Sequence, residues 1–312
     1  MNVQLLLEAL LSSTLEALPA LVLAALGAVL SERSGVIDIG VEGMMRVGAF
    51  FAAVAAIRLP TGAALLVGMA AGGGIAAIHA LLSLRWRANQ VVSGMALNLV
   101  ALAGVTFLLE SWYGPSGTPP ISQLHRYDLP GLDRLPVLRG FSHHSVLVYL
   151  ALVLPFGVQA FLFRTVAGLR LRAVGEKPAA AATLGLNVTR IRTLAVLASG
   201  LLAGLGGAAL STSTLDRFEQ HMPAGLGFMA LAAMVFGRWT PRGAFVAAIF
   251  FSLANALRIG LASSVPRILE VLPQGVLLAL PYLLTLVFLG LRSGNSQTPA
   301  ALGVPFDSES RI

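Results

Sequence analysis

The stretch SERSGVIDIGVEGMMRVGAFFAAVAA, residues 31–56, places Asp38, Glu42 and Arg46 in a sequence that is otherwise apolar enough to cross a membrane. A helix over residues 44–57 alone would cover about 21 Å at about 1.5 Å per residue, which is shorter than a hydrocarbon core of roughly 30 Å. A span here must therefore begin among the charged residues or be interrupted. The four-residue spacing predicts that all three charges share one helical face, with Glu42 before Arg46 in the favourable order of an ion pair.

Charges that face lipid in the middle of a span cost roughly 2.5 to 3.5 kcal/mol each, so these side chains must meet water, protein or headgroups. Two interpretations remain open: an ion-paired helix end at the cytoplasmic interface, and a broken helix that lines a translocation path. Three glycines within residues 35–43 allow such a break. Segment 223–237, which opens with Pro223 and contains Gly225 and Gly227, is also short. Two interrupted segments at corresponding positions of two halves indicate the central path of a transporter.

The composition is that of a membrane protein, because 56% of the 312 residues are hydrophobic and only 11% are charged, against about 25% in soluble domains. We expect an all-α polytopic protein with about nine spans, within a range of eight to ten. The apolar segments lie at about 14–30, 36–57, 62–84, 91–110, 145–163, 193–212, 223–237, 243–260 and 269–290. The net charge of +7 resides in the connections and is read as a topology signal rather than as a nucleic-acid surface.

The basic residues also set the expected orientation. The connection 164–192 is the richest in arginine and is therefore predicted to be cytoplasmic by the positive-inside rule. The C-terminus is then cytoplasmic, the N-terminus is external, and residues 111–144 form one long external loop. We expect a membrane domain over residues 1–292 and a polar, loosely ordered cytoplasmic tail over 293–312. Four spans on each side of segment 145–163 make matched spans run in opposite directions, as in an inverted repeat.

Polar and aromatic residues within the spans are candidates for a translocation path. The candidates are Asp38, Glu42, Arg46, Phe50, Asn89, Gln90, Ser93, Asn98 and Asn255. For any single amide or hydroxyl, a hydrogen bond between helices is the more common role. Phe50 and Phe51 point about 100° apart on a helix, so one of them is expected to face the path. His79 stands alone and is interpreted as a helix-packing residue.

Catalytic and metal-binding motifs are missing from the sequence. The chain has no cysteine, and its one lysine, Lys177, is followed by Pro178, so it holds no thiol chemistry and no P-loop. Neither HExxH nor GxSxG occurs. We therefore expect neither an enzyme nor a metal site in this chain.

Six pieces of the chain, in this order, resemble one family. They are SERSGVIDIGVEGMMRVGAFFA, RANQVVSGMALNL, GLRLRAVGEKPAAAATLGLNVTRIR, LASGLLAGLGGA, GFMALAAMVFGRWTPRGA and PAALGVPF. They resemble the permease subunits of bacterial ABC importers of the branched-chain amino acid and ribose type, in the branch that imports nucleosides. The resemblance implies an inverted-repeat permease in the cytoplasmic membrane, with a second permease, cytoplasmic ATPases that use ATP and Mg²⁺, and an external substrate-binding protein. It implies no cofactor in this chain.

Sugars and branched-chain amino acids are the alternative substrates within this class. An ion-coupled secondary transporter, with Asp38 and Glu42 as proton or sodium sites, is the alternative from another class. The energy source would separate the two classes, since only the importer depends on ATP.

The resemblance also implies two docking regions. The residues Gly175, Glu176, Lys177, Pro178, Ala181, Ala182 and Gly185 resemble the coupling loop that docks on the ATPase, although Ala179 stands where the family motif usually has Glu. Independently, Pro178 and Gly185 bracket an alanine-rich run that favours a short helix, and we expect its alanine face to insert into a partner. In the external loop, Arg126, Arg134 and Arg139 are the candidates for contact with the binding protein.

Overall fold

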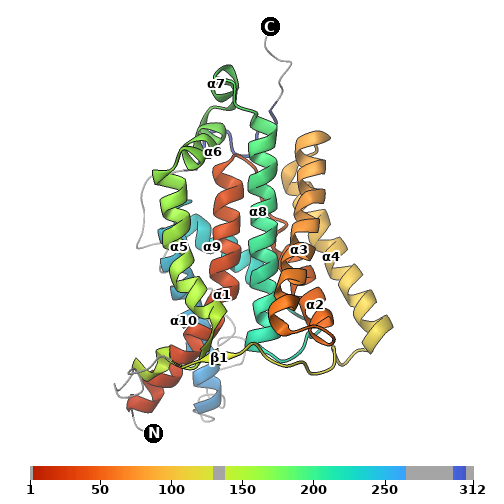
Figure 1. Ribbon diagram of the computed structural model, residues 1–312, viewed down its shortest axis with the longest axis vertical. Helices are drawn as coiled ribbons and strands as arrows, with labels where there is room; N and C mark the ends of the chain where they lie inside the picture. The colour runs from red at the N-terminus through yellow and green to blue at the C-terminus, as the bar shows by residue number, and fades with distance from the viewer. Residues whose placement is uncertain (1–2, 129–137, 265–297, 307–312) are drawn as a thin grey trace.

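The computed structural model describes residues 3–128, 138–264 and 298–306, and the regular structure in these residues is almost entirely helical (Figure 1). Within them the only strands are β1 (Arg126–Tyr127) and β2 (His144–Ser145), which pair antiparallel. The prediction of an all-α fold is confirmed. The helices are α1 (Val3–Arg33), α2 (Val41–Ala56), α3 (Thr61–Ala80), α4 (Gln90–Tyr113), α5 (Val146–Arg164), α6 (Val166–Glu176), α7 (Pro178–Thr183), α8 (Val188–Ala209), α9 (Leu226–Phe236) and α10 (Pro241–Ser264).

Three short helical turns supplement these helices: π-helical turns at Leu81–Arg85 and Leu210–Thr214, and a 3₁₀ turn at Leu138–Phe141. Among the described residues, five helices are long and apolar enough to cross a membrane. They cover Leu7–Arg33, Thr61–Arg85, Gln90–Tyr113, Val146–Arg164 and Val188–Thr214, and they match five predicted spans. The predicted spans 36–57 and 223–237 contain the shorter helices α2 and α9, as their interruption predicts, and α10 covers 243–260. The ninth predicted span, 269–290, lies outside the described residues.

The two central helices are α1 and α8, which lie side by side through the middle of the bundle (Figure 1). Residues 20–29 of α1 are almost wholly buried, because other helices surround this part of α1. Around this pair the contacts are mirrored: α3 packs on α8 as α10 packs on α1, and α2 packs on α3 and α8 as α9 packs on α10 and α1. If α1, α2 and α3 correspond to α8, α9 and α10, each helix packs on the counterparts of the helices on which its own counterpart packs. The predicted inverted repeat has this arrangement.

Close approach of α3 and α8 depends on glycine. A Cβ atom on Gly72 would lie 2.5 Å from the backbone oxygen of Gly200 and 2.6 Å from the Cα atom of Gly204. No side chain fits in that space. Small residues that let helix backbones touch are the usual means of helix association in membranes.

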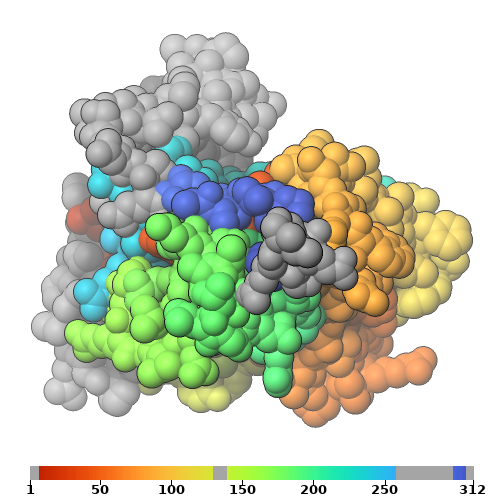
Figure 2. All heavy atoms as spheres, turned by 90° about the horizontal axis from the view of Figure 1, so that it is seen from above, coloured from red at the N-terminus to blue at the C-terminus, as the bar shows by residue number. Residues whose placement is uncertain are grey.

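The two ends of the bundle differ. One end carries the N-terminus and the β1–β2 pair, and we call it the β end; the other carries α6, α7 and residues 298–306, and we call it the α7 end (Figure 1). Figure 2 looks onto the α7 end and shows residues 298–306, in blue, lying across it. The backbone of this segment is fixed, since Ala301 N donates to Gly175 O at 2.9 Å and Gly303 N donates to Gly35 O at 3.1 Å. The prediction of a loosely ordered tail is therefore wrong for residues 298–306.

Candidate translocation path and coupling site

The break in the second span is held by side chains from distant helices. Residues 34–40 are not helical, so their backbone groups need partners other than helical ones. Ile37 N donates to Gln90 Oε1 at 2.7 Å, and His79 Nε2 lies 3.0 Å from Ile37 O. The other ring nitrogen of His79 lies 3.0 Å from Ser93 Oγ. Two candidate path residues, Gln90 and Ser93, therefore support the break, directly or through His79.

Asn98 completes this support one helical turn further along α4. Its Nδ2 donates to Ile39 O at 2.8 Å, and its Oδ1 accepts from Gly43 N at 2.8 Å. Asn98 lies eight residues from the start of α4, about 12 Å along the helix at about 1.5 Å per residue. The break is therefore well inside the bundle rather than at its end.

Asp38 does not share a helical face with Glu42 and Arg46, and that prediction is wrong. It precedes the first residue of α2, and its side chain is fully buried beside His79 and Ser199. Neither carboxylate oxygen has a hydrogen-bond partner among the described residues, and the same holds for Ser199 Oγ. No group of three potential metal ligands occurs in the described part of the chain. His79, interpreted from sequence as a packing residue, is thus part of a polar cluster.

Glu42 joins the two interrupted helices. Its carboxylate accepts from Gly225 N at 3.0 Å and from Gly227 N at 2.8 Å, at the N-terminus of α9. These are two of the backbone donors that a helix start leaves without intrahelical partners, and the helix dipole favours a negative charge there. Arg46 lies 4.0 Å from Glu42 and donates to Gln220 O at 3.0 Å. Both side chains are buried, so they meet protein and not lipid.

Phe50 belongs to an aromatic cluster on the β-end side of this contact. It is fully buried and packs edge-on against Phe51 and Phe218, with ring centroids 5.3 Å and 5.4 Å away. Trp112, at the end of α4, lies over Phe50 at 5.9 Å and is 52% exposed. The accessible aromatic surface is therefore that of Trp112, which the sequence reasoning missed. Its place at a helix end next to an acidic residue was the available signal.

Two polar side chains, one from α4 and one from the segment before α9, interact near the end of α4. Glu110 is exposed near the end of α4, and Gln220 Nε2 donates to its Oε1 at 3.2 Å. Gln220 also accepts the bond from Arg46 through its backbone. Residues two apart on a helix point about 200° apart, so the Glu110 carboxylate and the Trp112 ring lie on different faces of α4. The two interrupted segments and the end of α4 meet here.

The remaining candidate path residues have other positions. Asn89 is exposed and caps α4, accepting from Val91 N at 3.0 Å and from Val92 N at 3.2 Å. Asparagine is among the preferred residues for this role. Asn255 is half-buried on α10. The structure therefore gathers seven of the nine candidates near the break and the aromatic cluster, and leaves these two apart.

The predicted short helix of the coupling loop is confirmed as α7. Pro178 is its first residue, where a missing N–H costs nothing. Gly185 follows it with a φ of +82°, a left-handed conformation that favours glycine and stops a helix. Glu176 and Lys177 are exposed just before it, and Gly175 is buried.

The face of α7 that is exposed is not the one expected. Ala181 is only 3% exposed and packs inside the subunit with Val174 and Val188, and Ala182 borders the same cluster. The outward residues are Ala179, Ala180, Thr183 and Leu184. Leu184 is 82% exposed, the most of any large apolar residue described. Ala181 is therefore unavailable to a partner, and Leu184 is the most prominent apolar group at this end.

A buried arginine ties the α7 end together. Arg192 is fully buried; its Nε donates to Ser34 O at 3.1 Å and its Nη1 to Val304 O at 2.9 Å. Ala300 N donates to Glu176 Oε2 at 3.2 Å. Arg192 and residues 298–306 thus connect the start of the break to the residues that precede α7. We call this set the tail node.

The external-loop arginines are placed unequally. Arg126 Nη1 lies 2.8 Å from Glu16 Oε1 in α1, so its charge is already paired. Arg139 is exposed in the 3₁₀ turn. Arg134 lies outside the described residues. Of the two candidates that the structure describes, Arg139 is the more accessible.

Comparison with known proteins decides the family. The model of the branched-chain amino acid transport system permease component matches residues 10–281. The chain belongs to this family. It is 40% identical to the guanosine ABC transporter permease protein NupQ of Bacillus subtilis, over 98% of both chains. It is 36% identical to the nucleoside ABC transporter permease protein NupC of Lactococcus lactis, over 98% of this chain and 99% of the relative.

A third relative has another substrate in its name. The putative glucose ABC transporter permease protein TsgC13 of Haloferax volcanii is 39% identical, over 80% of this chain and 77% of the relative. Family membership makes the chain the multi-pass permease subunit of an ABC transporter and not an enzyme. Such a permease works with an ATPase and a substrate-binding partner.

Proposed function

We propose that this permease imports nucleosides across the cytoplasmic membrane. The observation that carries the proposal is the near full-length similarity to two permeases named for guanosine and nucleoside transport. The exposed ring of Trp112 supports it, because a base can stack on an exposed aromatic side chain.

The proposed orientation places the α7 end in the cytoplasm and the N-terminus and the β end outside. Six basic residues lie within residues 164–192 against one acid, Glu176, which is the bias of a cytoplasmic connection. Residues 1–292 then form the membrane domain, 111–144 an external loop and 293–312 a cytoplasmic tail. Arg139 is the proposed contact with an external binding protein, together with Arg126 and Arg134.

The proposed path runs past the contact between α2 and α9. Trp112 forms its outer mouth, while Glu42, Arg46 and Asn98 fix the geometry of the two interrupted helices beneath it. Interrupted helices allow a span to bend at a defined point, as in other transporters built from inverted repeats.

In this proposal, the movement that ATP hydrolysis causes in the partner ATPase is transmitted to the permease through α7. A cytoplasmic ATPase that uses ATP and Mg²⁺ docks on the outward face of α7, and Leu184 inserts into a cleft on the surface of the ATPase. The tail node connects α7 to the break at residues 34–40 through Arg192, so a displacement of α7 moves the segment that Gln90, His79 and Asn98 hold. A second permease, identical or related to this one, completes the membrane part.

A sugar is the second candidate substrate, because two relatives, TsgC13 among them, are named as glucose permeases, TsgC13 putatively. The secondary transporter is set aside, since family membership assigns the energy source to a partner ATPase. Equilibrium binding by the external binding protein of this system tests the substrate. Binding of guanosine and adenosine, with ribose, glucose and leucine bound at least a hundredfold more weakly, is expected. Preferred binding of glucose or leucine would overturn the nucleoside proposal.

A further inference from the structure

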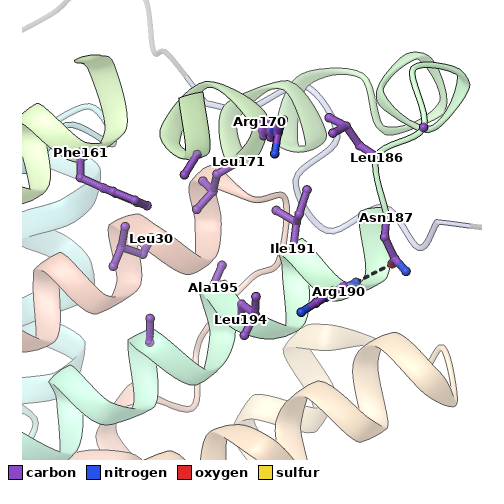
Figure 3. A pocket seen from close by; sticks show the side chains of 13 residues that line it. Leu30, Phe161, Arg170, Leu171, Leu186, Asn187, Arg190, Ile191, Leu194 and Ala195 are labelled. Atoms are coloured by element: carbon purple, nitrogen blue, oxygen red, sulfur yellow. Dashed lines mark hydrogen bonds between the residues drawn. The ribbon is translucent and has the colours of Figure 1, made fainter. Parts of the chain in front are cut away.

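A groove of about 470 Å³ runs along the flank of the bundle at the α7 end (Figure 3). Its walls come from α1, α5, α6 and α8, and most of its lining is aliphatic or aromatic. Phe161 and Leu194 line it with 39% and 57% of their surfaces exposed. The volume is within the range of pockets that hold small ligands. No residue of the aromatic cluster or of α7 itself lines this groove, although Gly185, just after α7, does.

The length of the groove along α8 can be compared with the thickness of one leaflet of a bilayer. Its lining on α8 extends from Asn187, just before the first helical residue, to Ala198. From Arg190 to Ala198, eight residues at about 1.5 Å each cover roughly 12 Å, which fits within the half of a hydrocarbon core, about 15 Å. On α5 the groove is lined by Phe161, three residues before the helix ends at Arg164.

The outer rim of the groove is positively charged. Arg170 on α6 and Arg190 on α8 line it, together with the amide of Asn187 (Figure 3). Both arginines are exposed, and neither forms an ion pair with any residue that the structure describes. None of the described lining residues is acidic. An apolar floor below a rim of two guanidinium groups is complementary to an acyl chain below a phosphate.

We propose that this groove binds an anionic phospholipid of the cytoplasmic leaflet. One acyl chain lies along Phe161, Leu194 and Ala198, and the phosphate lies between Arg170 and Arg190. The inference rests on the proposed orientation, in which the α7 end is cytoplasmic. A lipid fits better than the ATPase, because the groove follows the flanks of α5 and α8 below their ends, whereas a soluble partner meets the outward face of α7.

The test is native mass spectrometry of the assembled importer, titrated with phosphatidylglycerol or with phosphatidylcholine of the same acyl chains. Each arginine near an anionic headgroup contributes roughly a fivefold preference. Arg170→Gln and Arg190→Gln should each lower the preference for phosphatidylglycerol about fivefold, and the double variant should abolish it. Arg242→Gln is the matched control, because Arg242 is exposed at the start of α10 and does not line the groove, so it should change nothing.

Ala198→Trp fills the inner part of the groove and should lower binding of both lipids. Displacement of the lipid by soluble glycerol phosphate at equal concentration would mean a phosphate site without an acyl chain, and would overturn the proposal. So would arginine variants that keep the lipid preference but lose the ATPase from the complex. Binding is measured without transport, so failure of the nucleoside proposal leaves this result unaffected, and the reverse also holds.

Discussion

Glu42→Gln should weaken the contact between the two interrupted helices. The native carboxylate accepts from Gly225 N and Gly227 N at 3.0 Å and 2.8 Å and is buried. A glutamine amide can accept only one of these bonds and turns its NH₂ group toward the other N–H. One hydrogen bond to a charged group, about 1.5 to 3 kcal/mol, is therefore lost, and a buried donor is left without a partner.

The assay combines thermal unfolding of the purified permease in detergent with transport by the assembled importer. A loss of about 2 to 3 kcal/mol should lower the melting temperature by roughly 5 °C, and transport should fall because α9 is no longer held against α2. Glu219→Gln is the matched control, since Glu219 is exposed on the segment that leads to α9, and exposed substitutions stay within about 0.5 kcal/mol. A Glu42→Gln variant that keeps its melting temperature but loses transport would refute this reasoning and indicate that Glu42 contacts the substrate.

Three further predictions concern the coupling end and the outer mouth. Leu184→Asp should prevent ATPase binding in pull-down without changing permease stability, whereas Ala181→Trp should destabilise the permease itself by about 1 to 3 kcal/mol through overpacking; the opposite pattern would mean that Ala181 faces the partner. A chain that ends at residue 297 should lose transport-coupled ATP hydrolysis because Arg192 loses Val304 O, while a chain that ends at 306 should keep it; equal hydrolysis by both would remove the tail node from coupling. Trp112→Ala should raise the KM for guanosine uptake roughly 5- to 150-fold, from a stacking energy of about 1 to 3 kcal/mol, with Trp112→Phe in between; an unchanged KM would exclude stacking on this ring.

Much of the fold could be predicted from hydropathy and from helix punctuation. The five long spans follow from apolar length alone, and α7 follows from Pro178 and Gly185. The shortness of α2 and α9 was predictable because charges and glycines interrupt otherwise apolar runs. These signals are local, and local signals are what a single sequence records.

The unpredicted features depend on partners distant in sequence. Asp38 left the helical face of Glu42 because Gln90, His79 and Asn98 bind the backbone of residues 34–40. The orientation of α7 could not be read from a run of alanines, since nearly identical side chains carry no periodicity. The tail was predicted to be loosely ordered from its polar composition. Residues 298–306 are ordered by backbone hydrogen bonds to distant residues, which composition does not reveal.

The most direct test of the central claim is uptake of labelled guanosine by proteoliposomes that contain this permease with its second permease, ATPase and binding protein. We predict that uptake requires ATP on the cytoplasmic face of the permease and substrate-loaded binding protein on the other face. Uptake should persist when proton and sodium gradients are dissipated. Excess unlabelled adenosine should reduce it, whereas excess glucose should not. Uptake that follows an ion gradient without ATP, or that glucose alone competes with, would contradict the account.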